Sequence, residues 1–175
     1  MADPRAIIDP PSSDCETSPL DFLFGEHLRQ RQLAKALHLA ADGVINRKTI
    51  ARLVSFIRND LALHVMDEEL SFFPALRAAC EPEDKVEEIL EIMATEHQEC
   101  EADSDEIIAT LESMAAARKL DNRRSDRLRE FADRLRHHLA LENGVLLPIA
   151  RLRMNADALR SVGESMSARR AARRH

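Results

Sequence analysis

Four histidines and two glutamates recur in this chain as two copies of one pattern. In each copy a lone histidine follows a glutamate, a His-xxx-Glu pair begins 37 or 41 residues later, and a proline lies six residues after the glutamate of the pair. The six residues are His27, His64 and Glu68 in the first copy and His97, His138 and Glu142 in the second. Imidazole and carboxylate groups are common metal ligands. The duplicated set therefore indicates a site for two metal ions.

Helix geometry places the two members of each pair on one face. A residue advances about 100° around an α-helix, so positions four apart point nearly the same way. Each of the four histidines also shares its face with aliphatic or Phe side chains, which predicts that all four point into the core. Because each lies near the middle of its helix, antiparallel packing would bring them to one level. We expect one polar layer between two apolar layers.

The chain is predicted to be all-α, an up-down-up-down four-helix bundle with a short C-terminal fifth helix. Its 175 residues include only four glycines, and Ala, Leu, Glu and Arg favour helix. Short links between long helices favour antiparallel neighbours, and the polar layer argues against the alternative of a coiled coil. The helices are expected over residues 19–41, 46–79, 82–119, 122–154 and 155–172. Pro74 and Pro148 should kink or end the regular part of the second and fourth helices.

The types of ligand restrict the choice of metal. Buried charged groups in an aliphatic core cost several kcal/mol each without compensation, and metal ions provide that compensation. No cysteine lies at a position of the pattern, so structural zinc is disfavoured and iron is favoured, with manganese as the alternative. Four imidazoles and two carboxylates supply about eight bonds to two ions that take about twelve. Solvent, an oxo or hydroxo bridge and an exogenous ligand are expected to complete the coordination.

Three further residues near the pattern are weaker candidates. Glu101 stands four residues after His97 and is either an extra carboxylate ligand or part of a solvated acidic run. Asp60, one turn before His64, is a candidate acceptor for the second nitrogen of that imidazole. Cys100 is expected to be a small core residue, with a redox role as the alternative.

Composition and charge predict the domain boundaries, the binding partners and the location of the protein. Residues 1–17 are expected to form a flexible arm, residues 18–154 the bundle, and residues 155–175 a short helix with a basic, solvated tail. The net charge of −6 argues against non-specific binding of nucleic acid. Three cysteines without paired spacing, no signal pattern and no apolar run of membrane-spanning length predict a cytoplasmic protein that does not bind membranes.

The quoted residues resemble the hemerythrin-like family, specifically its HHE cation-binding domains. The resemblance covers residues 18–172 and is strongest at HVMDEELSFFP (64–74) and HLALENGVLLP (138–148), with FGEH (24–27) and ATEH (94–97). It implies a four-helix bundle that holds a non-haem, oxo-bridged di-iron centre. The implied ligands are His27, His64, Glu68, His97, His138 and Glu142. Glu68 and Glu142 would bridge the two irons.

Two departures from the oxygen-carrying hemerythrins bear on function. Those proteins have a histidine where this chain has Glu101, and a His-xxxx-Asp motif where it has His138-xxx-Glu142. Fewer imidazoles favour a reactive centre over reversible carriage of dioxygen. The absence of Tyr and Trp disfavours an oxidase that generates a side-chain radical.

Three functions remain as hypotheses. The first is a di-iron protein that binds or reacts with O2, H2O2 or NO, including a catalase-like or NO-reducing enzyme in which the di-iron centre itself is catalytic. The second is an iron- or oxygen-sensing module without turnover, which acts on a redox or regulatory protein partner. The third is a metal-free helical scaffold.

Overall fold

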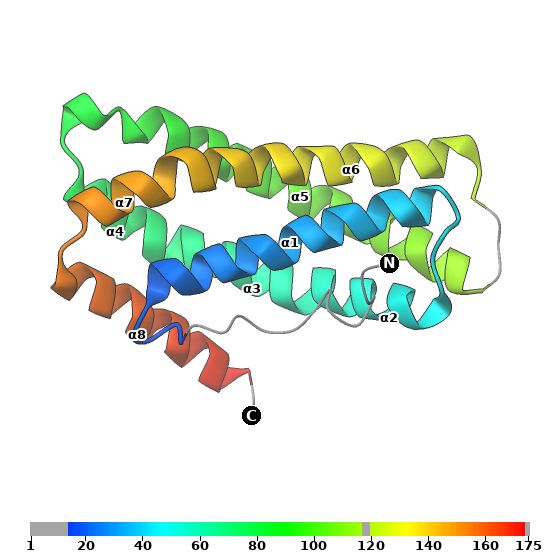
Figure 1. Cartoon of the computed structure of the whole chain (residues 1–175), viewed down its shortest axis with the longest axis horizontal. Helices are drawn as coiled ribbons and strands as arrows, with labels where there is room; N and C mark the ends of the chain where they lie inside the picture. The colour runs from blue at the N-terminus through cyan, green and yellow to red at the C-terminus, as the bar shows by residue number, and fades with distance from the viewer. Residues whose placement is uncertain (1–13, 117–119, 174–175) are drawn as a thin grey trace.

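The computed structural model describes residues 14–116 and 120–173, and these form four antiparallel rods and one shorter helix (Figure 1). The first rod is α1 (Pro19–Ala41). The second rod consists of α2 (Arg47–Ser55), η2 (Phe56–Leu61), α3 (Ala62–Asp67), η3 (Glu68–Phe72) and α4 (Phe73–Ala79). The third is α5 (Val86–Ala115), preceded by the short turn η4 (Pro82–Asp84). The fourth consists of α6 (Asn122–Leu141), η5 (Glu142–Leu146) and α7 (Leu147–Arg153), and α8 (Ala156–Ala172) follows. The prediction of an all-α, up-down-up-down bundle with a short fifth helix is confirmed.

The third rod differs from its predicted bounds at both ends. It was expected over residues 82–119, but the 3-10 turn Pro82–Asp84 ends at Lys85, whose φ of 51° breaks the helix before Val86. The Asp84 side chain accepts a hydrogen bond from the Glu81 backbone N–H, which closes this turn on itself. The helix ends at Ala115, and residues 117–119 of the predicted segment lie outside the described residues.

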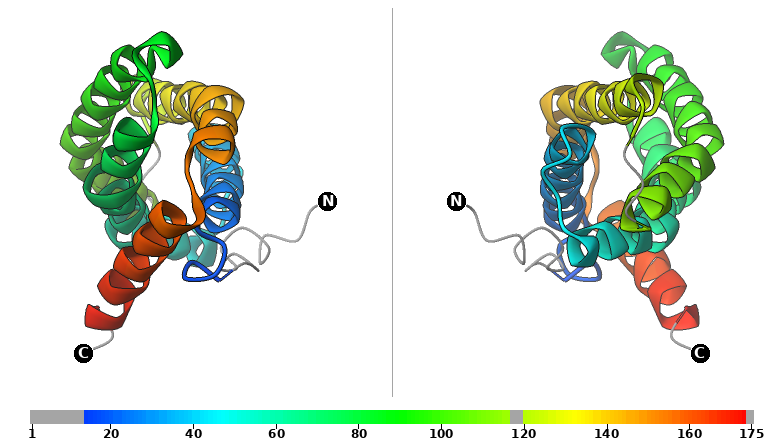
Figure 2. Two further views of the ribbon diagram at one scale, coloured as in Figure 1. Left: turned by 90° about the vertical axis from the view of Figure 1, so that its left-hand side faces the viewer. Right: turned by 90° about the vertical axis from the view of Figure 1, so that its right-hand side faces the viewer.

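The core consists of two apolar clusters at opposite ends of the bundle. One joins α2, α6, the second half of α1 and the second half of α5, around Leu37, Leu53, Ile107 and Leu128. The other joins α4, α7, α8 and the first halves of α1 and α5, around Leu23, Phe72, Leu90 and Leu146. The end-on views in Figure 2 show the four rods surrounding this core. A buried polar layer lies between the clusters, as the sequence predicts.

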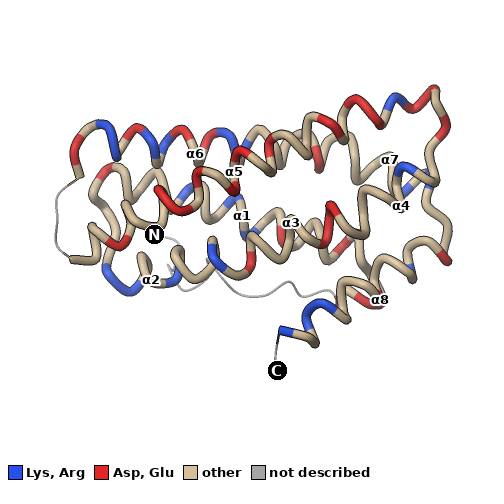
Figure 3. The backbone as a smooth tube through the Cα atoms, turned by 180° about the vertical axis from the view of Figure 1, so that it is seen from behind, with Lys and Arg blue, Asp and Glu red and all other residues tan. Residues whose placement is uncertain are grey.

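The helix α8 lies on the outside of the bundle (Figures 2 and 3). Two of its arginines contact the second rod. Arg169 and Arg170 lie 2.8 and 2.6 Å from the carboxylate of Asp67, which is fully buried. Arg173 donates to the carbonyl oxygen of Asn59. The prediction of a solvated tail is therefore wrong for Arg169 and Arg170, because the buried carboxylate of Asp67 requires their charge. Arg173 is exposed, and residues 174–175 of the predicted tail lie outside the described residues.

The segment before α1 also packs on α8. Residues 1–13 of the predicted flexible arm lie outside the described residues, but residues 14–17 form a turn in which Cys15 is buried. A Cβ atom at Gly163 would lie 2.7 Å from the carbonyl oxygen of Cys15 and 2.6 Å from that of Glu16, so only glycine allows this approach. Residues 14–17 of the predicted arm are therefore packed against the bundle. No helix of the described ranges is long and apolar enough to cross a membrane.

Candidate metal centre

The six residues of the duplicated pattern meet in the polar layer between the two clusters. They form two overlapping groups, and within each group the candidate ligand atoms lie within 4.8 Å of one another. The first group is His27, His64, Glu68 and Glu142, and the second group is His97, His138, Glu68 and Glu142. Every member is buried. Each group brings together side chains from three of the four rods, so the bundle as a whole builds the site.

Glu68 presents one carboxylate oxygen to each group. Its Oε1 lies 3.3 Å from Nε2 of His27 and 3.1 Å from Nε2 of His64. Its Oε2 lies 3.3 Å from Nε2 of His97. Both oxygens are therefore placed for cations on either side of the carboxylate.

Glu142 repeats this arrangement from the fourth rod. Its Oε2 lies 3.4 Å from Nε2 of His27, and its Oε1 lies 3.2 Å from Nε2 of His138. Both oxygens are inaccessible to solvent and accept no hydrogen bond from the described residues. A buried carboxylate without such partners is costly unless a cation lies against it. The geometry thus fits two cations that share both carboxylates.

A π-helical segment begins at each of the two glutamates. In η3 the N–H of Phe73 bonds to the carbonyl of Glu68, five residues back, and in η5 the N–H of Leu147 bonds to that of Glu142. The next residue in each rod is a proline, Pro74 or Pro148, which has no N–H to continue an α-helical ladder. The wider π-helical turn accommodates the missing hydrogen bond, which explains why each proline lies at the same distance after its glutamate. The predicted interruption of the regular helix therefore takes the form of a π-helical turn before each proline, and both rods continue beyond it.

Three of the four imidazoles donate their Nδ1–H to a polar side chain outside the two groups. His97 donates to Glu69 over 2.7 Å and His138 donates to Glu96 over 2.8 Å. His27 donates to Oδ1 of Asn143 over 2.9 Å. The Asn143 amide is oriented by its own Nδ2–H, which donates to the Leu139 carbonyl. The Nδ1 atom of His64 has no partner among the described residues.

These partners determine which ring nitrogen faces the centre. A carboxylate or amide oxygen accepts only from a protonated Nδ1, so the neutral imidazole presents its unprotonated Nε2 inward. The Nε2 atoms of His97 and His138 lie 3.1 Å apart. Two nitrogen lone pairs at this distance repel each other unless a cation or a proton lies between them. The second group is thus arranged as a pair of ligands to one ion.

The electrostatics of the site attract positive charge. Burial alone would lower the pKa of His138, but the negative charge of Glu142, whose Oε1 lies 3.2 Å from the ring, outweighs this and raises the pKa to about 10. In the same way burial is outweighed for His27, where the charge of Glu142 and hydrogen bonding to Glu68 raise the pKa to about 9. Burial would raise the pKa of Glu68, but His64 and the hydrogen bonds of the imidazoles hold it well below its usual range. Without a metal ion, the centre retains protons in its place.

The weaker candidates lie outside both groups. Glu101 is exposed and belongs to neither group. Asp60 accepts from Arg29 over 2.8 Å and not from His64, so its predicted role is wrong. Burial raises the pKa of the Cys100 thiol to about 11, which keeps it protonated and disfavours a redox role for a thiolate.

Sequence reasoning did not identify the residues that orient the imidazoles. Glu69 and Asn143 each follow a central glutamate directly, so they occupy the same position in the two copies. Glu96 was visible as the neighbour of His97, but its partner is the histidine of another rod. The repeated position after Glu68 and Glu142 was the signal that could have found the first two.

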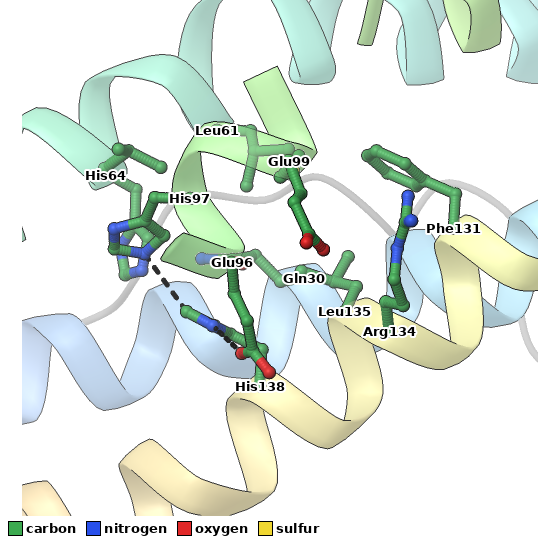
Figure 4. Close-up of a pocket in the computed structure, with 12 residues that line it drawn as sticks. Gln30, Leu61, His64, Glu96, His97, Glu99, Phe131, Arg134, Leu135 and His138 are labelled. Atoms are coloured by element: carbon green, nitrogen blue, oxygen red, sulfur yellow. Dashed lines mark hydrogen bonds and ion pairs between the residues drawn. The ribbon is translucent and has the colours of Figure 1, made fainter. Parts of the chain in front are cut away.

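A small cavity of about 60 Å³ adjoins the centre on one side. Figure 4 shows His64, His97 and His138 towards one end of it, with Phe131 and Arg134 towards the other. Glu99 and Arg134 on its lining are exposed, so the cavity lies between the buried imidazoles and the protein surface. It offers a small molecule space beside both groups.

Comparison with known proteins agrees with this geometry. The family model described as the hemerythrin HHE cation binding domain matches residues 18–150, a range that contains all six candidate ligands. An uncharacterized protein of Haemophilus influenzae is 25% identical over 176 aligned residues, which cover 94% of this chain and 96% of that protein. The buried groups of imidazoles and carboxylates, which the geometry suits to cations, thus lie within a matched cation-binding domain.

Proposed function

The chain belongs to the hemerythrin HHE cation binding domain family, and from this premise we propose that it is a non-haem di-iron protein that binds or reacts with O2, H2O2 or NO. The observation that carries the proposal is the sharing of two carboxylates, each with one oxygen directed to each group. Two imidazoles and two carboxylate oxygens would give each ion four ligands. An octahedral ion retains two positions for other ligands.

The ligand chemistry supports iron as the resident metal. The donors are nitrogen and oxygen atoms, and the thiol of Cys100 near the site is protonated. When bound, a pair of iron ions supplies Lewis acidity and redox chemistry at these open positions. The chain supplies the other requirements. Glu69, Glu96 and Asn143 hold three imidazoles in the orientation that directs Nε2 inward, and the two apolar clusters exclude bulk water.

Metal analysis joined to absorption spectroscopy tests the proposal. Protein loaded anaerobically with Fe(II) should contain two irons per chain, and exposure to O2, H2O2 or NO should change its near-ultraviolet and visible spectrum. The absence of Trp and Tyr leaves a weak protein background for these bands. The control variant His38→Gln changes a histidine that pairs with Asp133 outside the site, and it should retain the iron. A preference for zinc, or an iron-loaded protein whose spectrum none of the three ligands changes, would contradict the proposal.

A further inference from the structure

Gln30 is a buried polar residue whose side-chain amide nitrogen has no hydrogen-bond partner among the described residues. It lies on α1, three residues after His27, and only 1% of its surface is exposed. Its Nε2 atom is inaccessible to solvent and donates no hydrogen bond to any residue of the ranges 14–116 and 120–173. A buried amide donor without a partner costs free energy, so its presence requires an explanation.

The amide lies on the lining of the cavity beside the metal centre. In Figure 4 the end of the Gln30 side chain extends to the side of the cavity on which His64 and His97 lie. Most of the interior lining is apolar and contributed by Leu61, Val65, Phe131 and Leu135. The unpaired N–H of Gln30 is therefore a polar donor in a largely apolar space next to two imidazoles of the centre.

The size of the cavity restricts what this donor could bind. A volume of about 60 Å³ is several times the roughly 10–15 Å³ that one water needs and well below the roughly 300 Å³ of a typical ligand pocket, so it suits a ligand of a few heavy atoms. Such a ligand must accept a hydrogen bond at one end to satisfy Gln30. A diatomic or triatomic molecule or anion with a terminal oxygen or nitrogen meets both conditions.

We propose that Gln30 is a positioning residue that donates a hydrogen bond from Nε2 to the outer end of a small ligand whose inner end lies at the His64–His97–His138 side of the centre. The inference rests on the proposed function, because the inner end requires a metal ion. Gln30 then selects ligands that carry a hydrogen-bond acceptor at the end away from the metal. Cys100, which also lines the cavity, is a protonated thiol and a poor substitute for this donor.

Azide binding to the iron-loaded protein tests the proposal. Azide has three heavy atoms and accepts hydrogen bonds at its outer nitrogen, and its binding is followed by absorption while infrared spectroscopy reports its stretching frequency. Gln30→Leu should weaken azide binding about 10-fold or more, because a hydrogen bond to a charged acceptor is lost. The stretching frequency should also shift. Gln30→Glu should weaken binding further, since a carboxylate repels the anion. The matched control Gln98→Leu makes the same change at an exposed residue beside His97, and it should leave both measurements unchanged.

Unfolding of the metal-free variants separates a ligand-positioning role from a structural one. If Gln30 serves a ligand, Gln30→Leu removes an unpaired buried donor and should leave the urea midpoint unchanged or raise it. A lowered midpoint would assign Gln30 a structural role and overturn the inference, as would azide binding within twofold of wild type. Iron-loaded wild-type protein that binds no azide would contradict the proposed function as well. Normal azide binding by Gln30→Leu would contradict the inference alone.

Discussion

The two halves of the bundle, residues 26–69 and residues 96–143, have the same candidate ligands but different surroundings. In the second half Glu96 accepts from Nδ1 of His138. In the first half the corresponding Glu26 accepts from Arg29 over 2.7 Å, and Nδ1 of His64 has no partner among the described residues. The two halves thus share the residues that face the candidate metal centre and differ in the residues behind them.

A reversal of charge accompanies this difference. Arg29 and Asp60 form an ion pair between the first and second rods, and Arg29 also lies over the ring of Phe56. The corresponding residues of the second half are Glu99 and Arg134, which stand on the lining of the cavity. The cavity is also lined by Gln30, Leu61, His64 and Val65 of the first two rods, so it opens between the two halves and not within one of them.

The two candidate metal positions differ in the partners of their imidazoles. Both imidazoles of the second group donate to carboxylates, whereas in the first group one imidazole donates to an amide and the Nδ1 of the other has no partner within residues 14–116 and 120–173. A carboxylate behind an imidazole makes its other nitrogen a stronger donor. We expect the second group to bind its ion more tightly, and the following variants test this comparison.

Removal of a shared carboxylate should have the largest effect. Glu68→Ala withdraws an oxygen from both groups, so iron content should fall from two ions per chain to nearly none. His64→Ala removes a ligand from the first group alone and should leave about one ion. Metal analysis of both purified variants checks this. Equal iron content in the two variants would mean that Glu68 is not shared.

Neutralisation of Glu96 and of the corresponding Glu26 should affect the Fe(II) affinity of the two halves differently. Glu96→Gln keeps an acceptor for His138 but removes its charge, and Fe(II) affinity at the second group should fall about 10- to 100-fold. The matched change Glu26→Gln, at the corresponding position of the first half, should alter affinity less than about threefold because Glu26 faces Arg29. Competition with a chromogenic chelator measures both. Similar losses in the two variants would refute the inequivalence.

The pH dependence of stability should distinguish metal-free from loaded protein. The pKa values of His27 and His138 are raised to about 9 and about 10 in the folded chain, against about 6.5 unfolded. Between these values the folded state holds more protons, so the unfolding free energy of the metal-free protein should fall by a few kcal/mol as pH rises from about 6.5 to about 10. The stabilisation is complete below pH 6.5. In the loaded protein metal ions replace the protons and the decline should vanish.

Urea unfolding at several pH values measures this effect. His138→Gln should reduce the decline in the metal-free protein, whereas His137→Gln, at an exposed neighbour, should leave it unchanged. A metal-free stability that rises over this interval would show that the centre does not retain protons.

The contact with α8 should give the smallest effect. Only the first half has a buried carboxylate here, because the residue corresponding to Asp67 is Leu141. Arg169→Ala removes one of its two cations and should lower the unfolding free energy by about 1–3 kcal/mol. The control Arg160→Ala, which removes an exposed pair with Asp157, should cost less than about 1 kcal/mol. Indistinguishable urea midpoints for the two variants would show that Arg169 contributes no more than a surface pair.

The sequence predicted the bundle and the juxtaposition of the six candidate ligands because both depend on periodicity. With 3.6 residues per turn, the four-residue interval places His64 and Glu68 on one face of the helix. The spacing of the apolar residues indicates that this face points into the core. The partners of the imidazoles were not predictable in this way. Whether Glu26 accepts a hydrogen bond from His64 or from Arg29 depends on how the rods pack. The ion pair between Arg170 and Asp67 depends on packing in the same way. Identification of the residues as metal ligands remains a prediction.

The π-helical turns after Glu68 and Glu142 also determine the rotational phase between two parts of each rod. Each turn contains a five-residue bond, so the side chains after it are rotated by about one residue relative to a continuous α-helix. Phe73, which follows the first turn, thereby stacks on the ring of His97. Insertion of one further residue within 69–72 would preserve the helical character of the rod but rotate everything beyond it by about 100°, whereas deletion of one residue would return the turn to α-helical geometry. The distance from glutamate to proline thus sets the rotation of the helix beyond it, and insertions there should disrupt the apolar cluster before they disrupt the helix.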